Sequence, residues 1–214
     1  MRYYDFGLAP NPRRVNVFIK EKGLTIETIS INLRAGEQFS DAFLKVNPQA
    51  TVPCLQLDDG SVLLESMAIC RYLEALHPTP CLFGSEPLDI AHIEQWSRRT
   101  EMEGFLAIAD ALRNSEPRFA NRAVPGRHDY AQIPELAERG KLRCMVFFEE
   151  LDKRLAGREF LATTFFSVAD INAYITIEFA ARVGVKPAAT MGNLLRWYKA
   201  VGERPSVRAL PAPP

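Results

Sequence analysis

The sequence lacks a surplus of charge of either sign. Its 214 residues include 26 Lys and Arg and 26 Asp and Glu, so the formal net charge at pH 7 is zero. Without a basic excess, no global field draws the chain to nucleic acid or to an anionic membrane surface. No apolar run resembles a membrane span, and no secretory signal pattern precedes the strand-like start MRYYDF. We therefore expect a cytoplasmic protein with no nucleic-acid or membrane partner.

The sequence also offers little for metal or thiol chemistry. Four cysteines occur, each isolated from the others: Cys54, Cys70, Cys81 and Cys144. Because no C-x-x-C pair is present, neither a zinc site nor a dithiol redox site is available. The three histidines do not fall at a metal-ligand spacing either. We therefore expect no metal in this protein.

The composition is that of a folded chain, and the sequence patterns divide the chain into an α/β segment and a helical segment. Hydrophobic residues make up 47% of the sequence, which is ordinary for globular proteins. Up to residue 76, β-rich runs alternate with helical patterns in the order β-α-β-α-β-β-α. After a proline-rich linker at residues 79–88, the periodicity is helical throughout. We expect an α/β domain at residues 1–78 and an all-helical domain at residues 89–214.

Local signals set the boundaries in the first domain. Asn11 is expected to be the N-cap of the first helix, with Pro12 at its first position and Gly23 as its stop. Asp59-Gly60, between two apolar runs, predicts a β-hairpin. The expected elements are strands at residues 3–6, 26–31, 54–57 and 62–64, and helices at residues 12–22, 40–46 and 65–76.

The second domain reads as long helices joined by irregular segments. Ser167 and Asp170 form a predicted capping box, whose role we expect to be structural. Residues 114–132, with two prolines and Gly126, are expected to form an irregular loop, and the tail LPAPP is expected to fray. The helices are predicted at residues 89–113, 134–155, 168–183 and 191–201.

Pro53 lies at the start of a predicted core strand, in the stretch NPQATVPCL. Proline has no N–H for a strand ladder, so it marks either a sheet edge or a cis turn. In the second case, the turn at Thr51, Val52 and Pro53 leaves the Val52 N–H and C=O free for a ligand. These residues alone leave both interpretations open.

Three motifs occur in order along the chain: NPQATVPCL, LLESMAICRYLE and FFSVADINAY. With the order of elements, they resemble the motifs of cytosolic glutathione transferases, and the resemblance covers essentially the whole chain. It implies a thioredoxin-like N-terminal domain, a helical-bundle C-terminal domain, glutathione as co-substrate and a homodimer. It also implies that Pro53 is cis and that the Val52 backbone pairs with the cysteinyl part of glutathione.

The second motif suits the γ-glutamyl end of glutathione, which carries a carboxylate and an ammonium group. Ser66, near a helix N-terminus, can offer its hydroxyl and backbone N–H to the carboxylate, and Glu65 can pair with the ammonium group. Gln38 and Gln49 fall where family members often contact the tripeptide. A solvated loop amide is an equally good interpretation of each glutamine.

The resemblance breaks at the thiol-activating position. Most members place a Tyr, Ser or Cys there, but here the Ser or Cys position falls on Ala9, which has no side-chain donor. LAPNPRRV resembles an atypical branch in which the start of the first helix and a held water replace that side chain. The candidate catalytic residues are Asn11, Arg13 and Asn114, with Ser115 and His128 as further water-holding candidates. The other interpretation of Asn11 is a plain helix N-cap.

We therefore expect a glutathione transferase that adds the glutathione thiolate to electrophilic, largely hydrophobic substrates. Two alternatives stay open. One is a glutathione-dependent disulfide reductase, and the other is a glutathione-binding module without catalytic activity. A maleylacetoacetate isomerase is disfavoured because the Ser-Ser-Cys signature of that branch is missing.

Overall fold

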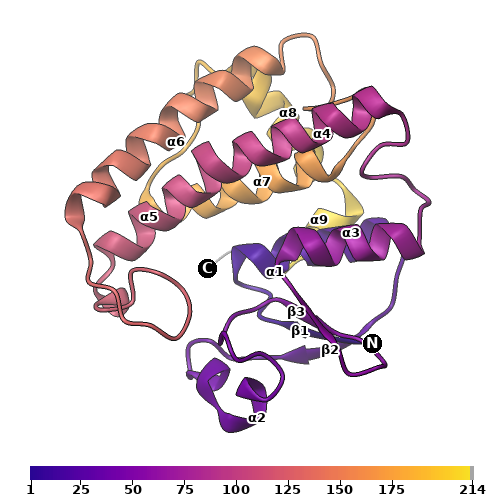
Figure 1. Ribbon diagram of the computed structural model, residues 1–214. Helices are drawn as coiled ribbons and strands as arrows, with labels where there is room; N and C mark the ends of the chain where they lie inside the picture. The colour runs from indigo at the N-terminus through magenta and orange to yellow at the C-terminus, as the bar shows by residue number, and fades with distance from the viewer. Residues whose placement is uncertain (213–214) are drawn as a thin grey trace. The chain divides into compact units, whose positions relative to one another are not determined.

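The computed structural model describes residues 1–212, which fold into two compact units (Figure 1). The first unit contains residues 1–80, the segment 125–128 and the tail from Ala209, and the second contains residues 81–124 and 129–208. The segment 125–128 and the tail were expected in the helical domain. They lie with the first unit instead, where Arg127 donates to the Pro48 carbonyl and Arg13 donates to the Pro211 carbonyl.

The first unit is built on a mixed four-stranded sheet with the order β2-β1-β3-β4. β1 pairs in parallel with β2 and antiparallel with β3, and β3 pairs antiparallel with β4. The turn of the predicted hairpin is confirmed, with Gly60 at φ +88°, where a side chain would be strained. The strands are β1 (Arg2–Asp5), β2 (Glu27–Ser30), β3 (Cys54–Gln56) and β4 (Val62–Leu64).

Helices cover both faces of this sheet, with α1 and α3 on one side and α2 on the other (Figure 1). Side chains alternate along β1, so Tyr3 and Tyr4 face opposite sides. On the α2 side, the Tyr4 ring packs against Phe43 with a centroid distance of 5.8 Å. The predicted β-α-β-α-β-β-α order is confirmed by the helices α1 (Pro10–Glu21), α2 (Asp41–Leu44), preceded by the 3-10 turn η1 (Glu37–Phe39), and α3 (Ser66–Leu76).

The predicted start of α1 was wrong. The helix begins at Pro10, and its N-cap is Ala9, which makes no side-chain cap. Asn11 therefore lies inside the first turn and is not the cap. Both Pro10 and Pro12 fit this turn, because the first N–H groups of a helix have no intrahelical partner. The predicted stop is correct, since Gly23 follows the helix at φ +63°.

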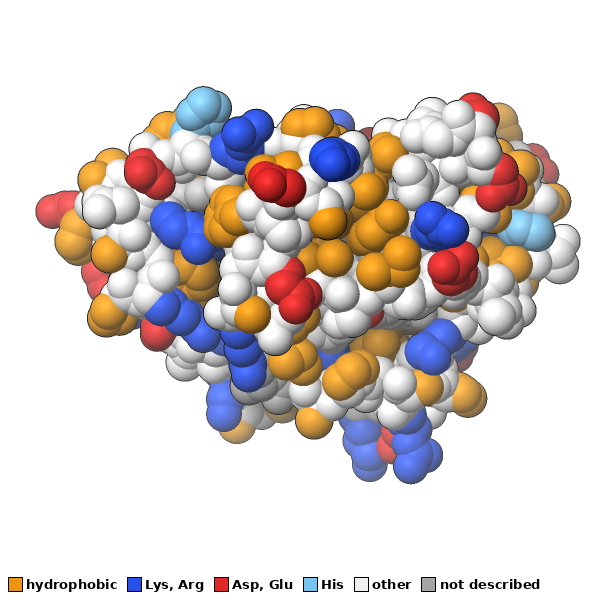
Figure 2. Space-filling view, turned by 90° about the horizontal axis from the view of Figure 1, so that it is seen from below, with side chains coloured by type: hydrophobic (Ala, Val, Ile, Leu, Met, Phe, Trp, Pro, Cys, Tyr) orange, Lys and Arg blue, Asp and Glu red, His pale blue; other side chains and the backbone are white. Residues whose placement is uncertain are grey.

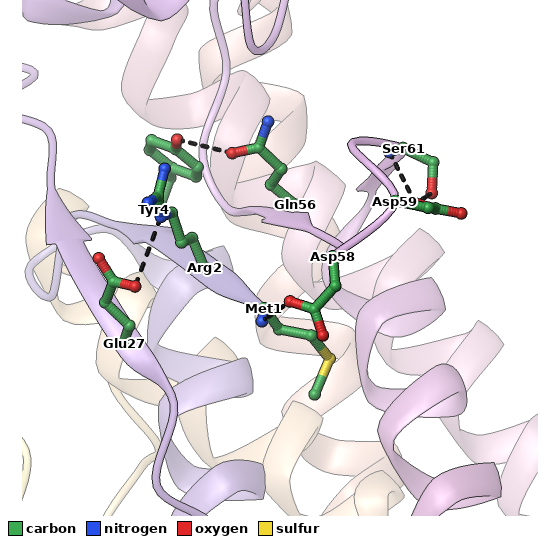
Figure 3. A network of polar contacts seen from close by, with 8 residues as sticks. All are labelled: Met1, Arg2, Tyr4, Glu27, Gln56, Asp58, Asp59 and Ser61. Carbon is green, nitrogen blue, oxygen red and sulfur yellow. Dashed lines mark hydrogen bonds and ion pairs between the residues drawn. The ribbon is translucent and has the colours of Figure 1, made fainter.

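Polar contacts on the sheet bind its strands and the hairpin to one another (Figure 3). Arg2 on β1 bonds Glu27 on β2 at 3.4 Å, and the Tyr4 hydroxyl donates to Gln56 on β3 at 3.2 Å. In the hairpin turn, the Ser61 N–H and hydroxyl donate to Asp59 at 2.9 and 2.6 Å. These bonds lower the pKa of the exposed Asp59 carboxyl. The Arg2 and Tyr4 bonds thus link β1 to each of its two neighbouring strands.

The second unit is helical, as predicted, and α7 forms its centre. Every residue of α7 except Glu178 is buried, which is typical of a helix enclosed by others. The long helix predicted at 89–113 continues to Ser115 and contains a π-helical turn over Thr100–Phe105. The helices are α4 (Pro87–Arg99), η2 (Thr100–Phe105), α5 (Leu106–Ser115), η3 (Pro117–Phe119), α6 (Pro134–Arg154), α7 (Val168–Ala180), η4 (Ala181–Val183), α8 (Gly192–Gly202) and α9 (Pro205–Arg208).

The predicted capping box of α7 is confirmed, and its role is structural. The Asp170 carboxylate accepts the Ser167 N–H at 3.0 Å and the Ser167 hydroxyl at 3.1 Å. Its other oxygen accepts the Leu161 N–H at 2.8 Å and the Trp197 indole N–H at 3.0 Å. One buried carboxylate thus joins the start of α7 to the preceding loop and to α8.

The face of the molecule seen in Figure 2 carries side chains of both charges. Lys and Arg side chains are interspersed with Asp and Glu among hydrophobic ones on the face seen in Figure 2, in keeping with the zero net charge. None of the helices formed by residues 1–212 combines the length and the apolar character that crossing a membrane requires.

Candidate functional site

The loop before β3 presents an unpaired stretch of backbone at Val52. The Val52–Pro53 bond is cis, as predicted. Asn47, which is 0% exposed, anchors the loop by donating to the Thr51 carbonyl at 2.8 Å and to its hydroxyl at 3.2 Å. Within residues 1–212, the Val52 N–H and C=O have no hydrogen-bond partner. A free donor and acceptor on one residue can pair with an extended peptide, as an added strand would.

The start of α3 presents a buried hydroxyl and an exposed carboxylate. Glu65 is the N-cap residue, with φ 67° and ψ 122°, and its exposed side chain does not cap the helix. A non-glycine residue held in the left-handed region costs of order 1–3 kcal/mol, and such strain clusters at functional sites. Ser66 follows as the first helical residue and is only 4% exposed. This helix end can receive an anion, with a carboxylate beside it for a cation.

Asn11 links this helix end to the start of α1. The Ser66 hydroxyl donates to Asn11 Oδ1 at 3.4 Å, and Arg14 Nη1 donates to the same oxygen at 3.3 Å. A guanidinium has no acceptor, so the amide oxygen must face it and the amide nitrogen must point elsewhere. Asn11 Nδ2 has no partner among the described residues. The side chain is therefore oriented with its donor free.

In the first turn of α1, the donors that are left to bind a ligand belong to Asn11. Pro10 and Pro12 have no N–H, and the Arg13 N–H donates to the Ala9 carbonyl at 3.1 Å. In the part of the chain that the structure describes, the Asn11 N–H has no acceptor. Asn11 thus carries a backbone donor and an amide donor at the positive end of the helix dipole.

The loop between β1 and α1 has no side chain that activates a thiol. Its residues, Phe6 to Ala9, carry no hydroxyl or thiol. The Tyr3 hydroxyl donates to the Pro12 carbonyl at 3.2 Å, and burial raises its pKa. The Tyr4 hydroxyl donates to Gln56 on the α2 side of the sheet. Neither tyrosine takes the place of the missing group at Ala9.

Two arginines of α1 are buried, although the sequence analysis singled out only one. Arg13 is 2% exposed and donates to the carbonyls of Pro211 at 2.7 Å and Gly7 at 3.4 Å, and its role toward the thiol stays a prediction. Arg14 is the residue that bonds Asn11, and it was not among the residues predicted from the sequence. Arginine on the buried face of a helix, next to Val15 and Phe18, was the available signal, because a buried cation needs nearby acceptors.

The two glutamines differ in burial. Gln38 in η1 is only 4% exposed, and its Oε1 has no hydrogen-bond partner among residues 1–212. A buried amide oxygen without a donor is costly, which is unlike the solvated loop amide that was the alternative. Gln49 is exposed, with its backbone N–H held by Asn47 Oδ1 at 3.0 Å. Among residues 1–212, neither glutamine forms a hydrogen bond with Ser66 or Asn11, and the ligand roles of both stay predictions.

The water-holding candidates of the helical domain are already engaged. Asn114 Nδ2 donates to the Asp110 carbonyl at 2.9 Å, and its Oδ1 accepts the Ile133 N–H at 2.8 Å. The Ser115 hydroxyl donates to the Ala111 carbonyl at 2.7 Å. Asn114 thereby connects the end of α5 to the residue before α6. His128 is exposed and lies in the segment that groups with the first unit. The catalytic role of these residues stays a prediction.

The cysteine nearest the loop is not a nucleophile. Cys54 follows Pro53 directly, and burial raises the pKa of its thiol to about 12. Burial also raises the pKa of Cys70 on α3, with the positive charge of Arg14 acting in the opposite direction. Both thiols are therefore protonated at neutral pH. Neither cysteine is therefore suited to supply a thiolate.

Two protein-family models match this chain, one in each half of the sequence. Residues 9–76 match the family model described as glutathione S-transferase, N-terminal domain. Residues 123–205 match the model described as glutathione S-transferase, C-terminal domain.

Individual relatives are similar to this chain over nearly its full length. Glutathione S-transferase 2 of Saccharomyces cerevisiae is 33% identical, covering 98% of this chain and 89% of its own. The crystal structure of Gtt2 from Saccharomyces cerevisiae superposes with a TM-score of 0.87 at 32% identity, over 97% of this chain and 99% of that chain. A glutathione S-transferase domain-containing protein of Marinobacter aquaeolei VT8 also gives 0.87, at 31% identity and over 97% and 100% of the two chains. The chain belongs to the glutathione S-transferase family.

Proposed function

We propose that this protein is a glutathione transferase that adds the glutathione thiolate to electrophilic, largely hydrophobic substrates. The observation that carries the proposal is the Ser66–Asn11 hydrogen bond, which joins the helix end suited to an anion to the helix end suited to a thiolate. The unpaired Val52 backbone lies at the start of β3 in the same unit. Glutathione is a peptide with an anionic end and a thiol, so it uses all three features.

Each part of glutathione has a partner in this proposal. Its γ-glutamyl carboxylate accepts from the N-terminal N–H groups of α3 and from the Ser66 hydroxyl, whose single proton turns from Asn11 to the ligand on binding. Its ammonium group pairs with the Glu65 carboxylate. Its cysteinyl backbone pairs with the N–H and C=O of Val52, beside Thr51 and Pro53. The buried Gln38 amide and the exposed Gln49 amide serve as further polar partners of the tripeptide.

The thiol is activated at Asn11. Lowering a thiol pKa from about 8.5 to about 6.5 requires roughly 2.7 kcal/mol of preferential thiolate stabilisation. A partly buried helix N-terminus supplies up to about 2 kcal/mol. A hydrogen bond to a charged group adds about 1.5–3 kcal/mol, and Asn11 has two such donors, its N–H and Nδ2. The helix end and Asn11 together meet the requirement without a hydroxyl at position 9.

Binding and turnover assays test this function. The protein should be retained on immobilised glutathione and should conjugate glutathione to aryl halides or epoxides. Turnover of a disulfide substrate without conjugation would favour the disulfide reductase, and retention without any turnover would favour the binding module. Absence of glutathione binding would overturn the proposal.

We also propose that the protein is a homodimer, with the face formed by η2, α5 and α6 as its interface. Five large hydrophobic side chains are exposed on these helices: Met102, Leu106, Leu142, Met145 and Val146. Patches of this kind on a folded chain are typical of interaction sites. A cavity of about 290 Å³ on these helices is lined by Leu142 and Val146 together with charged residues.

The charges on this face suit a second copy of the same chain. Arg99, the last residue of α4, bonds Glu150 of α6 at 2.6 and 2.5 Å, and Arg143 of α6 bonds Glu103 of η2 at 3.1 Å. A two-fold interface brings the same surface patch together from both subunits, so a patch carrying both signs of charge complements itself. A surface of one sign would repel its own copy.

A further inference from the structure

The C-terminal tail is held by a buried arginine of the first helix. Arg13 is 2% exposed, and its Nη1 donates to the Pro211 carbonyl at 2.7 Å and to the Gly7 carbonyl at 3.4 Å. A buried guanidinium is stable only where acceptors replace the water that it loses. One of these acceptors comes from the loop before α1, and the other comes from a residue 198 positions away in the sequence. The expectation that the tail frays was therefore wrong up to Pro211; Pro213 and Pro214 lie outside the described residues.

The tail also packs directly on this loop. A side-chain carbon added at Gly7 would lie 3.4 Å from Pro211 Cγ and 3.5 Å from Asp5 Oδ2, so the proline ring and the backbone of Gly7 are in close proximity. The tail from Ala209 groups with the first unit, whereas α9, immediately before it, belongs to the second. Arg13 thus bonds the Gly7 carbonyl, and the Pro211 ring lies close to the Gly7 backbone.

The composition of the tail suits this role. Proline has no N–H, so Pro211 can lie against the loop without leaving a donor unsatisfied. Its ring fixes one backbone dihedral, and it restricts Leu210 to extended conformations. Less conformational entropy is lost when such a segment becomes ordered. One strong acceptor, the Pro211 carbonyl, is then sufficient to anchor it.

We propose that Arg13 is a positioning residue that straps the tail, residues 209–212, across the loop Phe6–Ala9 and thereby holds the start of α1 in place. The Ala9 N–H donates to the Phe6 carbonyl at 2.7 Å, and Ala9 is the N-cap, so this loop sets where the first turn begins. The strap therefore fixes the direction in which the two free donors of Asn11 point. Its effect on the thiol rests on the proposed function, but its effect on the loop does not.

Two truncations and one substitution test the strap. Ending the chain after Leu210 removes the Pro211 carbonyl, while ending it after Ala212 keeps that carbonyl and is the matched control. Arg13→Met removes the donor while filling much of the same volume. The double variant, Arg13→Met with the truncation after Leu210, should show less than the sum of the two single effects, because both changes remove the Arg13–Pro211 hydrogen bond.

The first readout needs no ligand. Hydrogen exchange of the Ala9 amide should accelerate by about tenfold in Arg13→Met and in the truncation after Leu210, and stay unchanged in the Ala212 control. The second readout is the thiolate absorbance of bound glutathione as a function of pH. Its midpoint should rise by about 0.5 pH unit, since a displaced helix end loses part of its thiolate stabilisation.

The two readouts separate this proposal from the proposed function. If the unmodified protein does not bind glutathione, the proposed function fails, and the exchange of the Ala9 amide still decides the strap. If Ala9 exchange and the thiolate midpoint are both unchanged after removal of Pro211, the strap is overturned. If Arg13→Met does not fold, the truncation series gives the same decision.

Discussion

The Ser66 hydroxyl donates a hydrogen bond to Asn11 Oδ1 at 3.4 Å, which connects the first residue of α3 to the first turn of α1. Arg14 donates to the same oxygen at 3.3 Å. Asn11 is therefore held by two donors through its oxygen, and its nitrogen is left to donate outward. This arrangement leads to predictions that separate ligand binding from folding.

Ser66→Ala should weaken glutathione binding by roughly 1–3 kcal/mol, because a hydrogen bond to a charged carboxylate is lost. The thermal stability should change little, since the Ser66–Asn11 bond is long. Isothermal titration calorimetry measures the affinity. Ser61→Ala is the control, because Ser61 lies in the exposed hairpin turn of the same unit. Unchanged affinity in both Ser66→Ala and Glu65→Gln would show that the γ-glutamyl assignment is wrong.

Asn11→Asp should raise the pH midpoint of thiolate formation more than Asn11→Ser does. The aspartate keeps an acceptor for Ser66 and Arg14, but it replaces the Nδ2 donor with negative charge beside the thiolate. Folding should be preserved, since an anion is favourable near a helix N-terminus and next to Arg14. Ultraviolet absorbance of bound glutathione measures the midpoint. Equal midpoints in the wild type and both variants would exclude Asn11 as the sulfur's donor.

Gly140→Ala should destabilise the helical unit by about 3 kcal/mol or more. An added side-chain carbon would lie 2.2 Å from the Ala107 carbonyl oxygen, which is backbone and cannot move away without separating α5 from α6. Gly192→Ala in α8 is the matched control, because nothing lies within 4 Å of its added carbon. That change should be neutral or stabilising by up to about 1 kcal/mol. Denaturant unfolding measures both, and equal effects would contradict the close helix contact.

Asp170→Asn should lower the free energy of unfolding by about 3 kcal/mol, since an amide presents a donor where the carboxylate accepts four hydrogen bonds. Burial raises the pKa of the Asp170 carboxyl from its ordinary value of 3.8, although its hydrogen bonds oppose the change. The folded state therefore holds the proton more tightly than the unfolded state does. The stability contributed by this titration is complete below pH 3.8 and is lost as the pH rises through the folded-state pKa.

The cost of Asp170→Asn should accordingly decrease as the pH rises from 3.8 through the folded-state pKa, because asparagine does not titrate. Denaturant unfolding of both proteins across this pH range shows whether the cost falls or grows with pH. A cost that grows as the pH rises would contradict the raised pKa.

Val146→Glu should convert the proposed dimer to monomers. Val146 is 64% exposed on α6, and a two-fold interface would bring two added carboxylates close together. Sedimentation equilibrium measures the mass, and Leu195→Glu on α8 is the control outside this face. A wild-type protein that is monomeric, or a Val146→Glu variant that remains dimeric, would exclude this face as the interface.

Much of the fold could be predicted because its signals are local. The Asp59-Gly60 turn, the helix stop at Gly23 and the Ser167–Asp170 capping box each depend on residues within about one turn of each other. The start of α1 was misplaced because both Asn11-Pro12 and Ala9-Pro10 are acceptable helix starts by local chemistry. A favourable N-cap side chain, such as that of Asn11, is not enough to distinguish the two helix starts.

The amino-acid sequence alone is enough to say which residue types are available at the site. It showed that position 9 has no hydroxyl or thiol, that Pro53 precedes the third strand, and that Glu65 and Ser66 begin a helix. It also determined that Pro10 and Pro12 remove two donors from the first turn, because proline has no N–H in any fold.

Which groups face one another depends on how the chain packs in three dimensions. Ser66 and Asn11 are 55 residues apart, and Arg13 and Pro211 are 198 residues apart. Their contacts form because the sheet brings α1 beside α3 and because a buried guanidinium requires acceptors wherever the folded chain supplies them. Local propensity contains no information about such pairs. The orientation of Asn11, and the use of Asn114 to join α5 to the start of α6, therefore depend on packing between distant segments.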